Sequence, residues 1–207
     1  MSLVASSKGG DYDPVPAGTH HGICIGLIDL GYQHNQTFGK WQPKVAIMWE
    51  LPRVRIEIDG EDLPRVISRI FTNSLNEKAA LFQILTSWRG RGFTPAELDA
   101  FDLRAVLGAN CLLSITHETR NNKTYANVTA VSSLMAGSTK LQPATIPFSY
   151  DIDNDGTIPE SVPEWMKEMI GRSREHTDAP IDPPPYEGGD EEEPVRAIAC
   201  PHDDVPF

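Results

Sequence analysis

Apolar and polar residues alternate with a period of two through much of the first half of the chain, which predicts β-strands. The alternation covers residues 19–30, 44–51, 53–60 and 63–72. Small glycines share one face of the first segment, a pattern typical of a strongly bent strand. A polar loop is expected over residues 31–43. The inward-facing residues expected in the second segment are Val45, Ile47, Trp49 and Leu51, and the outward-facing ones are Lys44, Ala46, Met48 and Glu50.

Helical spacing replaces this alternation after residue 73. Ser74 to Glu77 fits a capping box, apolar residues then recur at helical spacing, and Gly90 is placed to end the helix. A second, short helical turn is predicted at Thr94, with Pro95 in the first helical position. Alternation returns over residues 110–117 and 124–131. The chain therefore predicts three strands, a helix and two further strands.

This order within the length of one small domain is the layout of a five-stranded OB-fold barrel with one helix between strands 3 and 4. We therefore predict a mainly β protein, with a flexible lead over residues 1–17 and an OB-fold nucleic-acid-binding domain over residues 18–135. In such barrels strands 2 and 3 and the 1–2 and 4–5 loops form the usual binding face. Other small barrels fit the same pattern.

The chain changes character after this predicted domain. Residues 136–171 read as an extension, irregular over residues 137–150, followed by a short helix that Ser161 and Glu164 would cap. Residues 172–207 are rich in proline, glycine and acidic side chains, a composition that cannot form a core. We therefore predict a disordered acidic tail.

The negative charge is concentrated in this second part of the chain. The net charge of the whole chain is −11, yet residues 1–140 hold 14 Lys and Arg against 13 Asp and Glu, while residues 141–207 hold 4 against 16. The predicted barrel is thus nearly neutral and its cations are able to form a local patch. The overall acidity does not exclude nucleic acid as a partner.

No pattern in the chain indicates catalysis, a metal site or a cofactor. Cys24, Cys111 and Cys200 are far apart and lack metal-ligand spacing, so we expect reduced thiols. Asp151 to Gly156 matches the start of a calcium loop, but Val162 replaces the bidentate glutamate, and an Asx-rich turn is the better interpretation. No secretion signal or apolar stretch long enough to cross a membrane is present. We expect a cytoplasmic protein that is not an enzyme.

Basic and aromatic residues are interleaved on the strands and loops that form the binding face of such barrels. Single-strand binding requires cations that follow the phosphates and flat rings on which bases stack. The expected DNA-binding residues are Phe38, Lys40, Trp41, Lys44, Arg65, Arg69, Phe71, Arg120, Lys123 and Tyr125. For any one residue, packing against neighbouring strands explains its type equally well. Trp49 and Trp88 lie on apolar faces and are expected in the core.

The last five residues, Asp203, Asp204, Val205, Pro206 and Phe207, have the composition of a short ligand. Pro206 favours an extended backbone, and Phe207 offers an aromatic ring beside negative charges. This tip resembles the acidic C-terminal tip of bacterial single-stranded-DNA-binding proteins. The layout over residues 14–175 resembles phage-encoded single-stranded-DNA-binding proteins.

The resemblance implies a protein that acts in the cytoplasm of a bacterial host cell. It would coat single-stranded DNA in replication, recombination and repair, and recruit replication and recombination enzymes through residues 203–207. The resemblance leaves the oligomeric state open, a homo-oligomer included. Two alternatives stay open on the sequence alone. One is an OB-fold module that binds RNA or duplex DNA, and the other is a protein-only adaptor or inhibitor whose acidic tail mimics nucleic acid.

Overall fold

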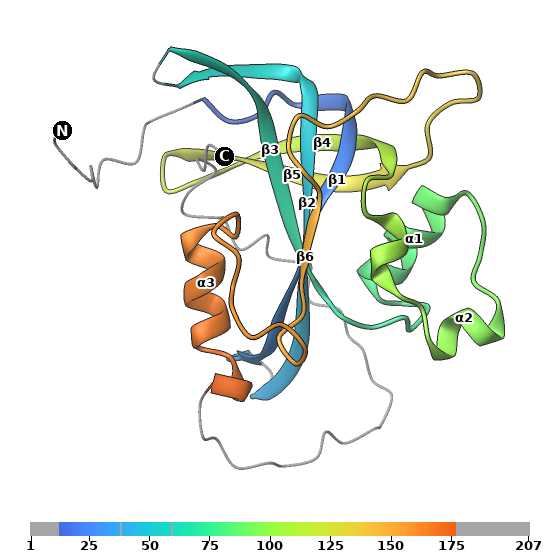
Figure 1. The fold of residues 1–207 in the computed structure, drawn as a ribbon, viewed down its shortest axis with the longest axis vertical. Coiled ribbons are helices and arrows are strands. Elements are labelled where there is room, and N and C mark those ends of the chain that lie inside the picture. The colour runs from blue at the N-terminus through green and yellow to red at the C-terminus, as the bar shows by residue number, and fades with distance from the viewer. Residues whose placement is uncertain (1–12, 38, 59, 177–207) are drawn as a thin grey trace, which may run out of the picture.

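The computed structural model describes residues 13–37, 39–58 and 60–176, and Figure 1 shows how their elements are arranged. The strands are β1 (Gly18–Asn35), β2 (Lys40–Ile58), β3 (Glu61–Thr72), β4 (Asn110–Arg120), β5 (Lys123–Ser132) and β6 (Phe148–Tyr150). The α-helices are α1 (Ala80–Arg89), α2 (Pro95–Asp99) and α3 (Glu164–Gly171), with short 3-10 turns at Leu103–Val106 and Arg174–His176. The lead predicted over residues 1–17 lies outside the described residues up to residue 12. Its described part is not a flexible lead, because Val15 is buried in the main core.

Strands β1 to β5 form a nearly closed antiparallel barrel in the order β3-β2-β1-β4-β5. Helices α1 and α2 lie between β3 and β4 in the chain. This is the strand order and helix position of an OB-fold, so the fold class predicted from the sequence is confirmed. Among the described residues β3 and β5, at the two ends of this order, have no ladder of paired backbone groups between them.

Strand β1 bends enough to pair with two different partners along its length. Its first part pairs with β4 from Gly18 to Ile23, and it pairs with β2 from Ile23 to Asn35. Its register shifts between Cys24 and Gly26. A Cβ atom at Gly26 would lie only 3.1 Å from the side chain of Met48. Glycine therefore permits the close approach of strands that the bend requires.

The barrel interior is apolar and is closed on one side by α1. Trp49 of β2 and Trp88 of α1 are both buried there, with ring centroids 6.1 Å apart, so the sequence prediction for both is confirmed. Gly90 ends α1 in the left-handed conformation (φ 68°), as its position predicts.

Two of the three predicted N-terminal helix caps are wrong. Helix α1 begins at Ala80 without a side-chain cap, because the Ser74 hydroxyl instead accepts a hydrogen bond from the Asn76 N–H in a local turn. Helix α3 begins directly after Pro163, and Ser161 makes no cap there. The Thr94 capping box of α2 is present in full, since Thr94 and Glu97 exchange both hydrogen bonds.

A second apolar core lies on the outside of β1, β2 and β3. It includes Ala46 and Met48, which the alternation placed outward and which are in fact covered by Trp165, Met166 and other residues of the extension. Figure 1 shows α3 and the pair α1 and α2 on opposite sides of these strands. Both faces of the central strands are therefore buried, and the extension is part of the folded domain.

The extension also contributes a strand that the sequence did not reveal. Residues 137–150 were expected to be irregular, but β6 pairs in parallel with β1 from Gly26 to Ile28. The predicted boundary at residue 172 is also wrong, because Ser173 is buried and the Glu175 carboxylate accepts hydrogen bonds from the Tyr32 N–H at 3.0 and 3.1 Å. The rest of the predicted tail, from residue 177, lies outside the described residues.

None of the helices in the described part of the chain is long and apolar enough to cross a membrane.

Candidate nucleic-acid interface

The outer face of β2, which the OB-fold layout made the expected binding face, is covered by the extension. Glu50 points out of the barrel here and is only 1% exposed. Its carboxylate accepts hydrogen bonds from the N–H groups of Ala144 (2.8 Å) and Thr145 (2.9 Å). Asn110 fixes the same segment nearby, because its side chain exchanges two hydrogen bonds with the backbone of Leu141. A strand of DNA therefore has no access to the middle of this face in the structure.

The predicted residues at the start of β2 form one group, at the tip of the β1–β2 hairpin. Lys40 is exposed, and Trp41 is half-buried with its ring edge-on to His34, at a centroid distance of 5.2 Å. Lys44 donates hydrogen bonds to Gln42 and to Thr72 of β3. Lys40 and Trp41 belong to a strand and not to the expected polar loop, which fixes the position of the ring.

The predicted residues of β3 face into the barrel. Phe71 is 3% exposed and belongs to the main core, so its assignment as a stacking platform is wrong. Arg69 lies over the Phe71 ring at 4.9 Å and donates a hydrogen bond from Nη1 to the Val128 carbonyl of β5 at 2.8 Å. Arg65 is buried as well, at 7% exposed. Arg65, Arg69 and Phe71 do share one face of β3, as the alternation predicts, but this face points into the barrel and not toward solvent.

The third group lies on the β4–β5 hairpin. Arg120 and Lys123 are exposed at its tip, and Tyr125 is half-buried. Arg120 forms an ion pair with Glu118 (2.6 Å), whose other oxygen accepts a hydrogen bond from Asn127. Lys123 therefore keeps its charge available, whereas the charge of Arg120 is partly neutralised.

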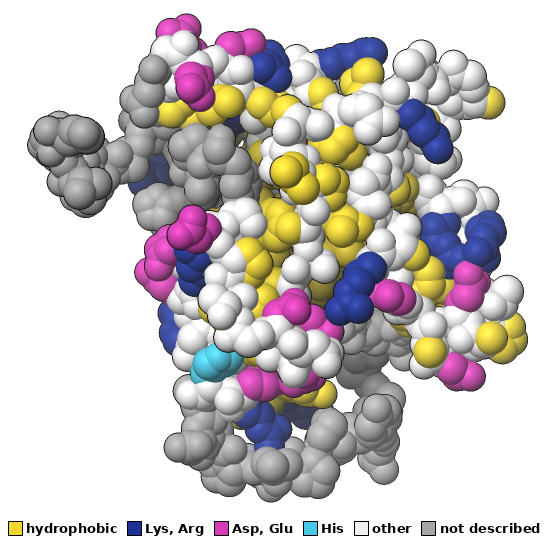
Figure 2. All heavy atoms as spheres, viewed as in Figure 1, with side chains coloured by type: hydrophobic (Ala, Val, Ile, Leu, Met, Phe, Trp, Pro, Cys, Tyr) yellow, Lys and Arg dark blue, Asp and Glu magenta, His cyan; other side chains and the backbone are white. Residues whose placement is uncertain are grey.

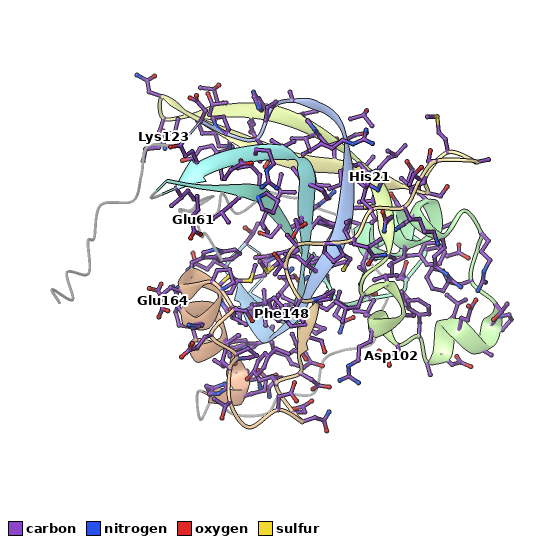
Figure 3. All side chains as sticks on the ribbon, turned by 45° about the horizontal axis from the view of Figure 1, so that its top comes forward. His21, Glu61, Asp102, Lys123, Phe148 and Glu164 are labelled. Atoms are coloured by element: carbon purple, nitrogen blue, oxygen red, sulfur yellow. The ribbon has the colours of Figure 1, made fainter. Side chains whose placement is uncertain are left out.

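These three groups do not converge on one surface as predicted. Lys40 pairs with Asn35 at one end of β1, whereas Gly18 at the other end pairs with Ile115, beyond which the β4–β5 hairpin continues. In Figure 3 the tip of that hairpin, marked by Lys123, lies on the same side as the tip of the β2–β3 hairpin, marked by Glu61. Phe38 and the tip at residues 203–207 lie outside the described residues.

The hairpins at this end project beyond the barrel as two arms. We define the first arm as the described residues 55–58 and 60–64, which follow a bulge in β2, and the second as residues 116–127. Arg53, in the bulge at the base of the first arm, is exposed and was not selected from the sequence. The sequence pattern around Arg53 alternates regularly, so it does not reveal the bulge that leaves this side chain exposed.

Ion pairs divide the surface cations into two classes. Those with a carboxylate partner are Arg55, Arg89, Arg91, Arg104, Arg120, Lys167 and Arg172. The exposed cations without an ion pair among the described residues are Lys40, Arg53, Lys78, Lys123 and Lys140. Figure 2 shows Lys and Arg scattered around the rim of one face, with hydrophobic side chains near its centre.

The candidate calcium loop at residues 151–156 has a structural role. Asp151 organises an Asx-rich turn, and a hydrogen bond from the Asn154 side chain holds the pKa of Asp151 below its ordinary value. Its carboxylate also binds Arg104 at 3.0 Å. No group of three or more potential metal ligands occurs within the described ranges.

The thiols of Cys24 and Cys111 are both buried and free. Burial raises the pKa of Cys24 to about 12 and also raises that of Cys111. A thiol with so high a pKa is a poor nucleophile at neutral pH.

Comparison with models of known protein families and with curated proteins finds no match for this chain.

Proposed function

We propose that this protein binds single-stranded DNA without sequence specificity and recruits replication or recombination proteins through residues 203–207. The observation that carries the first half is the OB-fold barrel with two arms on one side, where Arg53 and Lys123 are exposed and have no ion pair among the described residues. OB-folds commonly bind single strands with such hairpins and the adjoining strands. The second half rests on the composition of the tip.

In this proposal the strand passes between the arms. Arg53 and Lys123 neutralise phosphates and release condensed counterions, so affinity falls as salt rises. Tyr125 offers a half-buried ring on the second arm, and Trp41 offers another at the opposite end of β1. A base stacked on such a ring contributes about 1 to 3 kcal/mol and tolerates any sequence.

The tail would compete with DNA for the same cations. Residues 141–207 hold 16 acidic side chains, many of them beyond residue 176. A polyanionic segment tethered to the domain reaches a high local concentration near the arms. Its occupation of the arms at low salt would weaken DNA binding and leave the tip less accessible to partners.

The test is a salt series of poly-dT binding for the full-length protein and for a variant that lacks residues 177–207. This truncation keeps Ser173 and Glu175, which belong to the folded domain. We expect the truncated protein to bind more tightly and to lose partner recruitment. Equal affinity and equal recruitment would reject the tail's role, and competition with duplex DNA and RNA would reveal a different nucleic-acid preference.

A protein-only adaptor is the second candidate, and one observation favours it. Most arginines on the described surface already have carboxylate partners, Arg55 with Asp62 and Arg120 with Glu118 among them, which limits the positive potential of the arms. An adaptor would bind no poly-dT at any salt concentration. The same salt series therefore separates the two functions.

A further inference from the structure

Arg65 is a buried cation whose charge nothing in the described structure balances. Its side chain lies on β3, and the residue is 7% exposed. The Nη2 atom is fully buried and has no hydrogen-bond partner. No carboxylate among the described residues lies within ion-pair distance of its guanidinium. Arg65 thus differs from Arg69, which is held by Val128 and Phe71.

Such a group costs free energy in the folded protein. A buried charge that lacks both a counterion and hydrogen bonds loses its hydration without compensation. Two of its neighbours on the strands are buried and apolar: Leu51, its partner in register on β2, and Ile67, which shares its face of β3. An anion that entered this place would offset the cost.

Arg65 lies directly beneath the base of the first arm. Pro64 pairs with Arg55 in the first arm, whereas Arg65 pairs with Leu51 below the bulge, so Arg65 is the first residue of β3 beneath that arm. Further along the same strand, Arg69 bridges the gap between β3 and β5 through Val128. Arg65 therefore lies between the base of the first arm and this gap in the barrel wall.

The nearby acidic residues do not serve as its counterion. Asp62 binds Arg55 on the opposite face of the first arm, and Glu118 binds Arg120 and Asn127 on the second arm. Glu61 is exposed at the tip of the first arm. No acidic residue in the described ranges forms an ion pair with Arg65, so a bound anion would be its first counterion there.

We propose that Arg65 binds a phosphodiester group of the bound strand at the base of the arms, an inference that rests on the proposed single-strand binding. A phosphate suits the site better than a base because it brings the negative charge that the buried guanidinium lacks. The planar guanidinium fork also matches two phosphate oxygens. Arg65 then anchors the backbone while Arg53 and Lys123 contact it from exposed positions.

The decisive variant is Arg65→Met, which keeps the length of the side chain and removes its charge. In chloride buffer we expect its melting temperature to rise, because an apolar side chain replaces an uncompensated buried charge. We expect its affinity for poly-dT to fall at least about tenfold, as for a lost charge-assisted hydrogen bond. The slope of log affinity against log salt should fall by about 0.7, the value for one phosphate contact with a single strand.

Arg55→Met is the matched control, since Arg55 lies on the same hairpin but is exposed and paired with Asp62. It should leave the salt slope within error of the wild type. Arg65→Lys keeps the charge without the fork and should bind more weakly than the wild type with an unchanged slope. This second variant decides the matter if Arg65→Met folds poorly, because wild-type affinity in Arg65→Lys would overturn the proposal.

Inorganic phosphate distinguishes a strand phosphate from a free anion. Replacing chloride by phosphate at equal ionic strength should raise the melting temperature of the wild type and of Arg55→Met more than that of Arg65→Met. If that difference appears but Arg65→Met binds poly-dT as the wild type does, the site takes a free anion and the proposal is wrong.

A lower melting temperature of Arg65→Met in chloride indicates a structural role and also overturns the proposal. If the wild type itself binds no poly-dT, the proposed function fails together with this assignment. If the wild type binds poly-dT and the Arg65 variants bind it equally well, the proposed function stands and only the assignment of Arg65 fails.

Discussion

Arg69 of β3 donates a hydrogen bond from Nη1 to the backbone carbonyl of Val128 in β5, at 2.8 Å. The described β3 and β5 share no ladder of backbone hydrogen bonds, so this side chain links the two strands across the gap between them. The Phe71 ring lies 4.9 Å from the same guanidinium and fixes its orientation. A residue expected to contact phosphate therefore helps to close the barrel.

Arg69→Met should destabilise the protein by about 1.5 to 3 kcal/mol, the range for hydrogen bonds that involve a charged group. The measurement is urea unfolding followed by tryptophan fluorescence, with Arg55→Met as the exposed control. The poly-dT salt slope of Arg69→Met should equal that of the wild type. A smaller salt dependence of poly-dT binding, together with unchanged stability, would show that Arg69 contacts DNA instead.

Phe71→Ala should mainly lower stability and Trp41→Ala should mainly lower DNA affinity, although the sequence placed both residues in one binding set. Phe71 is buried in the main core, so Phe71→Ala should cost about 3 to 5 kcal/mol of unfolding free energy. Trp41 is half-buried at a hairpin tip, so its removal should change stability little and weaken poly-dT binding. Unfolding curves and anisotropy titrations of both variants provide the comparison, and unaltered binding by Trp41→Ala would remove that ring from the interface.

Glu50→Gln should release the segment that crosses the outer face of β2. Both carboxylate oxygens accept backbone N–H groups, from Ala144 and Thr145, and a glutamine presents an N–H in place of one acceptor. We expect a loss of about 1 to 3 kcal/mol and faster hydrogen exchange at those two amides. Glu57→Gln, at an exposed position on β2, serves as the control. Unchanged exchange at Ala144 and Thr145 would show that Glu50 does not hold the segment.

Glu97 gives a pH dependence whose direction follows from its partners. Hydrogen bonds from Arg91, from the Thr94 N–H and from Arg89 lower the pKa of Glu97 to about 2, from an ordinary value of 4.5. A group whose pKa is lower in the folded state stabilises that state above its unfolded pKa, and this contribution is lost as the pH falls toward the folded pKa. The stability difference between the wild type and Glu97→Gln should therefore be constant above about pH 5 and shrink between about pH 4.5 and 2. A difference that stays constant over that interval would contradict the assignment.

The thiols provide a check on the buried barrel interior. Cys24 and Cys111 should react with a thiol reagent at pH 8 only as fast as the protein unfolds, since both are buried and have raised pKa values. Cys200 lies outside the described residues, so a Cys200→Ser background isolates the other two. Rapid reaction of the folded Cys200→Ser protein would show that the interior opens.

The sequence by itself determined the order of the elements from β1 to β5 and several residues of the main core. Period-two alternation and helical spacing are local properties, and they placed Trp49 and Trp88 inside and identified the barrel. The Gly90 and Thr94 signals also held, because each depends only on neighbouring backbone groups. Ser74 was misread because its hydroxyl had a competing partner in the next turn.

Only the tertiary structure decided which faces of the strands are exposed. Alternation separates two faces but does not reveal that a later segment covers the second one, so Ala46, Met48 and Glu50 were expected in solvent. For the same reason the pattern on β3 did not show that Arg65 and Phe71 point inward. Burial of a face depends on contacts between residues distant in the chain, here β2 with residues 144–170, and a local pattern carries no record of them.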